Sequence, residues 1–317
     1  MVYYRITITP LGPLSTEWIS GTIWGHIAWA IRYVEGEASL EAWMKEQETA
    51  PWFFSSQMPE GMLPKPLLPP ITQDVKKTSL EEFDLIKEAR KISYIPEDLF
   101  LDLRDNIDEP VLLEPLKIEV KKRKAEPPMD RKGFKPLHLF HNRIDRQSGR
   151  TPETGGLFVE NSRWAEEGHR FQIFAAADQD CKKRLESLLT FIGHSGFGAN
   201  ASIGRGCFRF DITEENRLFG ESGNRAMSLS HGVITPAMGN PRYKQHTHYG
   251  KLGGHFAAGA YSPFKYPVLM ALPGATFDPC GELPYGKLLA GVHHDSSLDF
   301  IRHHALHLPI YFTEVTP

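Results

Sequence analysis

The N-terminal residues alternate between apolar and polar positions and then change to a helical spacing. The segment VYYRITITP, residues 2–10, alternates as a sheet strand does and ends at Pro10. Beyond it, apolar side chains recur at helical spacing at Ile23, Ile27, Ala30, Ile31 and Val34. Gly36 is expected to end this helix. Ser20 or Thr22 is expected to cap its start, where free N–H groups favour an anion.

Two further helices are expected before residue 100. Residues 40–44 are typical of a short helix. The segment SLEEFDLIKEARKISYIP, residues 79–96, has Ser79 as a cap and Glu82 three residues later, and Pro96 ends it. Residues 51–70 are rich in proline and apolar side chains, which predicts a chain lying extended across a surface. Residues 100–136 have only a weak pattern and are interpreted as an insertion.

The middle of the chain predicts two strands, a helix and a third strand. The strands lie near residues 157–160 and 170–175, and CFRFDIT forms the third. Between them is an amphipathic helix with Leu185, Leu188, Leu189 and Ile192 on one face. With the N-terminal strand and helix, this order is that of a ferredoxin-like split βαβ unit carrying a large insertion. The fold class is therefore predicted to be α+β.

The C-terminal part predicts a second set of strands. AMSLSHGVITP, YPVLMALPGATF and LPIYFTEV have strand character, and glycine and proline separate them. A polar, turn-rich stretch at residues 214–223 is the expected domain boundary.

Composition narrows the class of protein. The 317 residues are 41% apolar and 24% charged, as in a soluble globular chain, and about two domains are expected. No signal segment or membrane-spanning run is found, and three scattered cysteines without a CxxC motif predict neither disulfides nor a cysteine-based zinc site. We therefore expect a cytoplasmic protein without a membrane contact.

Basic residues are concentrated in one block. The net charge is −3, yet residues 121–150 contain ten Lys/Arg against three Asp/Glu, a local charge of +7. Such a block is a candidate nucleic-acid patch, and the alternative is a solvated charged loop.

The glycine-rich stretch FIGHSGFGANASIGRGCFRF, residues 191–210, imitates three motifs. Residues 196–201 satisfy G-x-G-x-x-[G/A], but a helix enters and a strand leaves, the reverse of a dinucleotide site. Gly193 and Gly198 have phosphate-loop spacing, but Ala199-Asn200 follows where Lys-Ser/Thr is required. Ser195 is not a nucleophile elbow, because Phe197 replaces the second glycine. We therefore expect no nucleotide cofactor.

What remains is a loop of small residues with polar members His194, Ser195, Ser202 and Arg205. Glycines allow backbone N–H groups to approach a ligand, and clustered N–H groups hold anions. A single-stranded nucleic-acid backbone suits such a surface. The alternative is a structural turn that needs positive φ.

Three segments together resemble the RAMP superfamily of CRISPR proteins: ISGTIWGHIAWAI, HNRIDRQSGRTPETGGLFVENSRW and GFGANASIGRGCFRF. The later HYGKLGGHFA, YSPFKYPVLMALPGATF and YGKLLAGV make the chain similar to the type III-A (Csm) effector subunit that grips the 5′ handle of CRISPR RNA. The resemblance implies two ferredoxin-like (RRM-like) domains, residues 1–215 and 216–317, with RNA between them. It also implies a β-hairpin thumb inserted in the first domain at about residues 100–155. The implied partners are CRISPR RNA, a large polymerase-type subunit and a backbone RAMP subunit.

The expected RNA contacts are of three kinds. Arg143, Arg146 and Arg150 pair with phosphates, and Phe140 and His141 stack on unpaired bases. The glycine loop holds the backbone, and Lys251 clamps it from the other domain. The full set expected to bind RNA is Ser20, Thr22, Phe140, His141, Asn142, Arg143, Arg146, Arg150, His194, Ser195, Gly196, Phe197, Gly198, Ser202, Arg205, Tyr249 and Lys251.

No catalytic residue and no metal site is predicted. The fourteen histidines lack acidic or cysteine partners at metal-ligand intervals. One alternative is a RAMP endoribonuclease that processes CRISPR RNA with a histidine as general acid/base, and His26 is then the candidate. Asp145 is a second candidate for RNA cleavage, since backbone RAMP subunits cut target RNA with a loop aspartate. It is expected instead to order a turn or to pair with an arginine. A third class, a protein–protein adaptor without RNA contact, also stays open.

Overall fold

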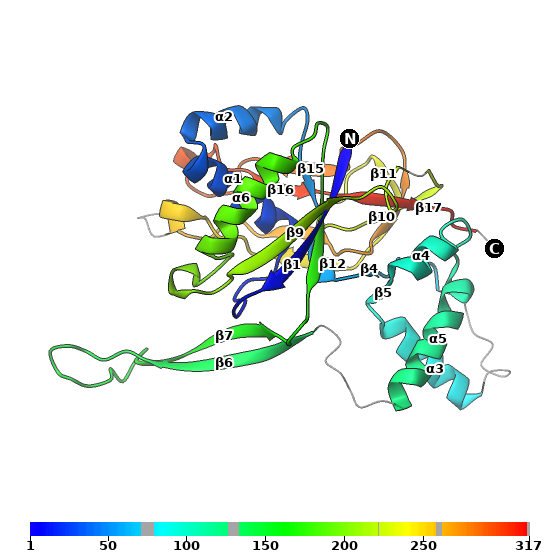
Figure 1. The fold of residues 1–317 in the computed structure, drawn as a ribbon, viewed down its shortest axis with the longest axis horizontal. Coiled ribbons are helices and arrows are strands. Elements are labelled where there is room, and N and C mark those ends of the chain that lie inside the picture. The colour runs from blue at the N-terminus through cyan, green and yellow to red at the C-terminus, as the bar shows by residue number, and fades with distance from the viewer. Residues whose placement is uncertain (71–78, 126–132, 221, 258–261, 316–317) are drawn as a thin grey trace.

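The structure is a computed structural model that describes residues 1–70, 79–125, 133–220, 222–257 and 262–315. A mixed α/β body carries a long hairpin on one side and a pair of helices on the other (Figure 1). The helices are α1 (Ser20–Val34), α2 (Glu37–Glu46), α3 (Leu80–Lys91), α4 (Glu97–Leu103), α5 (Glu109–Ala125) and α6 (Lys182–Ser195). None of these helices is long and apolar enough to cross a membrane, as far as the described residues go.

The first sheet is built from strands far apart in the sequence. Its order is β2-β8-β1-β9, with β3 also pairing β8, and every pairing is antiparallel. Helices α1 and α6 contact each other, and their apolar side chains share one core with the sheet. The strands are β1 (Val2–Pro10), β2 (Phe53–Phe54), β3 (Met58–Pro59), β8 (Phe171–Ala177) and β9 (Phe208–Glu214).

The local patterns explain why these elements form. Alternate residues Tyr4, Ile6 and Ile8 of β1 are fully buried, and α1 buries the predicted Ile23, Ile27 and Ile31 in the same core. Helix α6 likewise buries the predicted leucines and Ile192. The predicted cap of α1 is wrong, however: the N-cap is Ile19, Ser20 is the first helical residue, and no side chain caps this end.

The second sheet has the same kind of strand order. It runs β11-β14-β10-β17, again with every pairing antiparallel. Between residues 222 and 315 the described connections contain short 3₁₀ turns and no α-helix. The strands are β10 (Arg225–Ser228), β11 (Met238–Arg242), β14 (Thr276–Pro279) and β17 (Pro309–Phe312), and two strand pairs flank them, β12 (Gln245–His248) with β13 (Val268–Ala271) and β15 (Gly286–Leu289) with β16 (His303–Leu306).

The two halves share a second core. Phe174 and Ala176 of the first sheet belong to the same buried cluster as Met227 and Ile310 of the second. Helices α3 and α5 complete this cluster, so segments before residue 125 cover strands that come a hundred residues later. The division of the chain at residue 215 stays a prediction.

Residues 97–125 are more regular than expected. Instead of an irregular insertion they form α4 and α5, because Leu112, Leu113, Leu116 and Val120 have helical spacing and are buried. The Ser79 cap of α3 is confirmed, since its hydroxyl accepts the Glu82 N–H at 3.2 Å. That helix ends at Lys91, before β5 (Tyr94–Pro96), which pairs β4 (Met62–Pro64).

The proline-rich stretch 51–70 is extended as predicted, but its first half does not lie on the surface. Residues 51–56 are buried, and β2 and β3 complete the edge of the first sheet. The apolar side chains in this segment therefore belong to the core.

The hairpin projects from the body next to the linker between β1 and α1 (Figure 1). Its strands are β6 (Phe134–Asn142) and β7 (Leu157–Ala165), paired along their full length. At its root, Leu14 and Arg163 exchange backbone hydrogen bonds of 2.8 and 2.9 Å. The basic block continues from α5 into the hairpin, and its members at residues 126–132 lie outside the described residues.

Candidate nucleic-acid interface

The glycine loop between α6 and β9 closes on itself. Gly196 and Gly206 have φ of 90° and 71°, which side chains rarely adopt. A Cβ on Gly196 would lie 2.3 Å from the Arg205 carbonyl oxygen, and one on Gly206 would lie 2.1 Å from that of Phe197. Glycine is therefore required at both positions by the loop's own packing, whatever ligand it meets.

Most N–H groups of this loop already have protein acceptors. Gly198 donates to His26 Nε2 at 3.1 Å and Ala199 to Thr16 Oγ1 at 2.8 Å. Backbone carbonyls accept from six more, which are the N–H groups of Gly196, Phe197, Ile203, Gly204, Arg205 and Gly206. These groups cannot hold phosphates at the same time. Of the expected loop contacts, the side chains of His194 and Ser202 are exposed, whereas the Ser195 hydroxyl bonds back to the Phe191 carbonyl.

His26 of α1 contacts the glycine loop at Phe197 and Gly198. Its ring lies 4.2 Å from that of Phe197, which is itself buried and stacked 4.0 Å from Trp18. Burial lowers the pKa of His26 to about 4, so the ring is neutral at pH 7 and accepts the Gly198 N–H. The Nε2 lone pair of His26 is therefore occupied by the glycine loop.

Arg205 is held by a carboxylate that the sequence analysis did not single out. Glu160 of β7 accepts hydrogen bonds from Arg205 Nε at 2.8 Å and Nη2 at 3.4 Å. It also accepts from His141 Nε2 at 3.0 Å and from the Ser162 hydroxyl at 2.9 Å. Arg205 is the main reason why the pKa of Glu160 falls to about 2. The glycine loop and the hairpin are thus tied together at one buried ion pair.

Glu160 and Ser162 are the buried pair on β7, an otherwise largely exposed strand, and strand alternation puts them on one face. A sequence read for charge alone cannot separate this glutamate from a solvated one, because its partners come from other segments.

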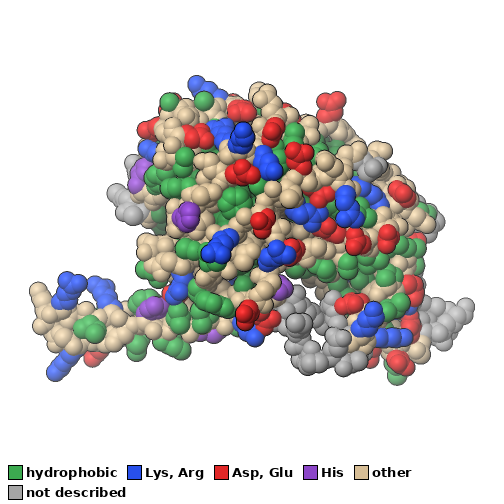
Figure 2. Space-filling model, in the orientation of Figure 1, with side chains coloured by type: hydrophobic (Ala, Val, Ile, Leu, Met, Phe, Trp, Pro, Cys, Tyr) green, Lys and Arg blue, Asp and Glu red, His purple; other side chains and the backbone are tan. Residues whose placement is uncertain are grey.

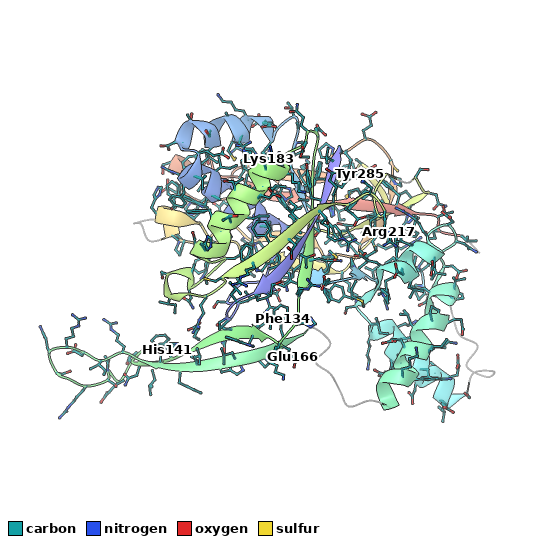
Figure 3. All side chains as sticks on the ribbon, viewed as in Figure 1. Phe134, His141, Glu166, Lys183, Arg217 and Tyr285 are labelled. Carbon is teal, nitrogen blue, oxygen red and sulfur yellow. The ribbon has the colours of Figure 1, made fainter. Side chains whose placement is uncertain are left out.

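Phe140 and His141 lie on opposite faces of the hairpin. His141, labelled on the hairpin in Figure 3, is paired with Phe158, stacks on its ring at 5.2 Å, and bonds Glu160 on the same face. Phe140 is paired with Val159 on the outer face and is 80% exposed. The two rings therefore cannot stack on bases along one surface, as the alternation of a strand requires.

The tip of the hairpin carries the free cations. Arg143, Arg146 and Arg150 are exposed, and within the described residues no hydrogen bond or ion pair of their guanidinium groups is found. Their blue side chains stand at the far end of the hairpin (Figure 2). Asp145 is not their partner: it orders the turn by accepting from the N–H groups of Gln147 and Ser148 and from the Ser148 hydroxyl. The Asn142 side chain accepts from Thr151 at 2.9 Å.

The remaining expected contacts lie around α1. Tyr249 is 68% exposed, and the Lys251 amine stands 5.1 Å from the Phe264 ring centre. Gly253 and Gly254, just after Lys251, pack on Trp29 of α1. Lys251 therefore lies near α1, the helix whose His26 also supports the glycine loop. Ser20 is buried, and its hydroxyl donates to the His231 carbonyl at 2.9 Å, so it has no exposed surface for a phosphate. Thr22 is half-buried.

A cavity of about 270 Å³ opens between the halves, beside the hairpin root. Its lining includes Trp18, Phe134, Arg163, Lys65 and Lys244. Burial, then the neighbouring Lys244, lowers the pKa of Lys65 to about 8, and its amine donates to two backbone carbonyls at the end of α3. No cluster of three or more potential metal ligands occurs among the residues that the structure describes.

Comparison with known proteins identifies the fold. No protein-family model matches the sequence, and no curated protein matches it. Among solved structures, chains from type III-A CRISPR-Cas assemblies have a similar mixed α/β fold.

The similar structures can be specified further. The chain is similar along its whole length to a chain of the Csm1–Csm4 cassette in complex with pppApA, with a TM-score of 0.58, 14% identity and 100% of both chains covered. The same values hold for the Csm3–Csm4 subcomplex of the type III-A CRISPR-Cas interference complex. Csm4 is the component that these two assemblies share. At this identity the likeness shows the fold.

Proposed function

We propose that this protein is a non-catalytic RNA-binding subunit of a type III CRISPR interference complex in antiviral defence. The observation that carries the proposal is the similarity of this chain to a chain of the Csm3–Csm4 subcomplex, with 100% of both chains covered. The subunit binds and caps the 5′ handle of CRISPR RNA and kinks the RNA where the handle meets the guide. We place it in the cytoplasm, without a membrane contact.

The two sheets support a pair of ferredoxin-like domains. The first has the connectivity strand–helix–strand–strand–helix–strand and the spatial order β2-β8-β1-β9. The second repeats that order with loops in place of helices. In this proposal the β6–β7 hairpin is the thumb, so the thumb covers residues 134–165 rather than the expected range of about 100–155.

The hairpin tip supports the RNA contact. Arg143, Arg146 and Arg150 are exposed cations held out on a strand pair, and guanidinium groups without a protein partner suit phosphates. Phe140 beside them offers an exposed ring for base stacking. Lys251, Tyr249 and Ser202 remain candidate contacts on the body. The glycine loop contributes as a structural support, because most of its N–H groups are engaged.

The assemblies of the similar structures suggest the protein partners. Csm1–Csm4 and Csm3–Csm4 pairs imply that this chain bridges a large polymerase-type subunit and a backbone RAMP subunit. The runner-up, a histidine endoribonuclease, has no support from His26, whose lone pair holds the glycine loop.

The test is co-expression of the chain with its complex, followed by sequencing of the RNA that copurifies. We expect CRISPR RNA with an intact 5′ handle. Recovery of the complex without RNA would favour the adaptor, and cleavage of repeat RNA that is lost in His26→Ala would establish the nuclease.

A further inference from the structure

Glu160 connects three separate segments of the chain at the hairpin root. It lies on β7 and is 8% exposed. Arg205 reaches it from the glycine loop, and Ser15 reaches both Glu160 and Ser162 from the linker after β1, at 3.5 and 3.0 Å. His141 bonds it from the opposite hairpin strand. One side chain therefore joins both hairpin strands to two elements of the body.

No polar attachment lies beyond Glu160 toward the tip. Nearer the body, the hairpin is held by the backbone pair of Leu14 with Arg163, and the Arg163 side chain also meets the exposed Glu17 at the surface. Among the described residues between 142 and 158, every side-chain or backbone hydrogen bond that we find stays within the hairpin. The Glu160 cluster is thus the last polar point at which the body can fix the hairpin's direction.

We propose that Glu160 is a positioning residue that sets the direction of the hairpin and so decides where the tip arginines meet RNA. The part concerning RNA rests on the proposed function, whereas the part concerning direction does not. A strand rises about 3.4 Å per residue, so the tip lies about 20 Å beyond Leu139, the cross-strand partner of Glu160. A rotation of about 10° at the root then moves the tip by about 3–4 Å, which exceeds the tolerance of a hydrogen bond.

The first arm of the test measures direction without RNA. Spin labels at Gln147 in the tip and Glu41 on α2, in a chain lacking its three native cysteines, report the tip-to-body distance. We expect one narrow distance in the parent chain and a broadened or shifted distribution in Glu160→Gln and in Arg205→Gln. The double exchange E160R/R205E restores the ion pair with reversed polarity and should narrow the distribution again.

A matched control is Glu17→Gln. Glu17 is also paired with an arginine at the hairpin root, but its side chain is 59% exposed, and the distance should not change. Variants are compared only if they unfold cooperatively, and Arg205→Gln tests the same pair if Glu160→Gln does not fold. An unchanged distance in the folded variants of both residues overturns the inference.

The second arm measures handle-RNA affinity, where positioning and simple electrostatics predict opposite signs. Removing a carboxylate near RNA should raise affinity if charge alone acts. Positioning predicts a several-fold loss in Glu160→Gln and recovery in the double exchange. Tighter binding by Glu160→Gln with an unchanged distance contradicts the inference. If the parent chain and its complex bind no RNA, the proposed function fails, and the distance arm still decides the role of Glu160 in hairpin direction.

Discussion

The hairpin carries polar side chains along its whole length, but its root and its tip differ in what those side chains contact. At the root, Arg205 and His141 both bond Glu160, whose side chain is buried. At the tip, Arg143, Arg146 and Arg150 are exposed, and their guanidinium groups bond to no described side chain. The sequence predicts RNA binding for Arg205 as a member of the glycine loop, as well as for the tip arginines. The difference teaches that an arginine already paired with a buried carboxylate supports the fold, whereas unpaired ones remain for a ligand.

The strongest way to break this comparison is to neutralise the tip. Arg143→Gln, Arg146→Gln and Arg150→Gln together should reduce the slope of log affinity against log salt by about 2, if each arginine meets one phosphate of a single strand. That slope corresponds to a loss of about 100-fold at 0.1 M salt. Binding titrations of handle RNA across salt concentrations measure both quantities, and the melting temperature should not change.

A matched control neutralises three exposed lysines of the body, Lys45, Lys183 and Lys287, which carry the same total charge. If this control weakens binding as much as the tip variant, the RNA contact is a general charge effect and the tip has no special role.

The contribution of the root to stability is tested by a substitution in the glycine loop. In Gly198→Ala the new Cβ would lie 2.3 Å from Thr16 Cβ, at a φ of 85°. We expect the free energy of unfolding to fall by about 1–3 kcal/mol for the strained backbone, with a further loss from the displaced linker. Gly204→Ala is the control, because its φ is 84° but no atom lies within 4 Å of a Cβ there. Equal losses in denaturant unfolding would show that Thr16 moves aside without cost.

Phe140 sharpens the comparison between the two faces of the hairpin. Phe140→Ala should weaken handle-RNA binding by about tenfold if its ring stacks on one base, at about 1–3 kcal/mol per base. Stability should not change, because the ring is 80% exposed. Leu157→Ala, which removes an exposed aliphatic chain from the same face, should have little effect on RNA binding. An equal loss in both variants would point to an apolar protein contact instead.

The smallest expected effect is the pH dependence of the stability that Glu160 contributes at the root. Arg205, then Ser162 and His141, lower the pKa of Glu160 from 4.5 to about 2. A carboxylate whose pKa is lowered by folding stabilises the fold above its unfolded pKa and loses that contribution as pH falls. The stability difference between the parent chain and Glu160→Gln should therefore be full above pH 4.5 and shrink toward pH 2. Thermal melts at pH 6 and pH 3 measure it, and a constant difference would mean that the carboxylate charge does not act.

Much of the fold could be predicted because the information is local. Periodicity located the first strand, α1, α3 and α6, and the positive φ that glycines permit explains the tight loop before β9. Helix α5 was missed because its buried leucines stand among charges and Pro115 interrupts the pattern. That Phe140 and His141 lie on opposite faces also follows from strand alternation, so the sequence contained that fact.

The candidate site depended on contacts that no local pattern contains. The sequence by itself determined that residues 143–150 carry cations in a turn and that residues 196–206 form a glycine loop. Only the tertiary structure decided that most of the loop's N–H groups are taken by His26, Thr16 and backbone carbonyls. It also decided that Arg205 belongs to Glu160. The physical reason is that a hydrogen-bonding group is free or engaged according to its neighbours in space, and these neighbours are supplied by segments distant in the chain.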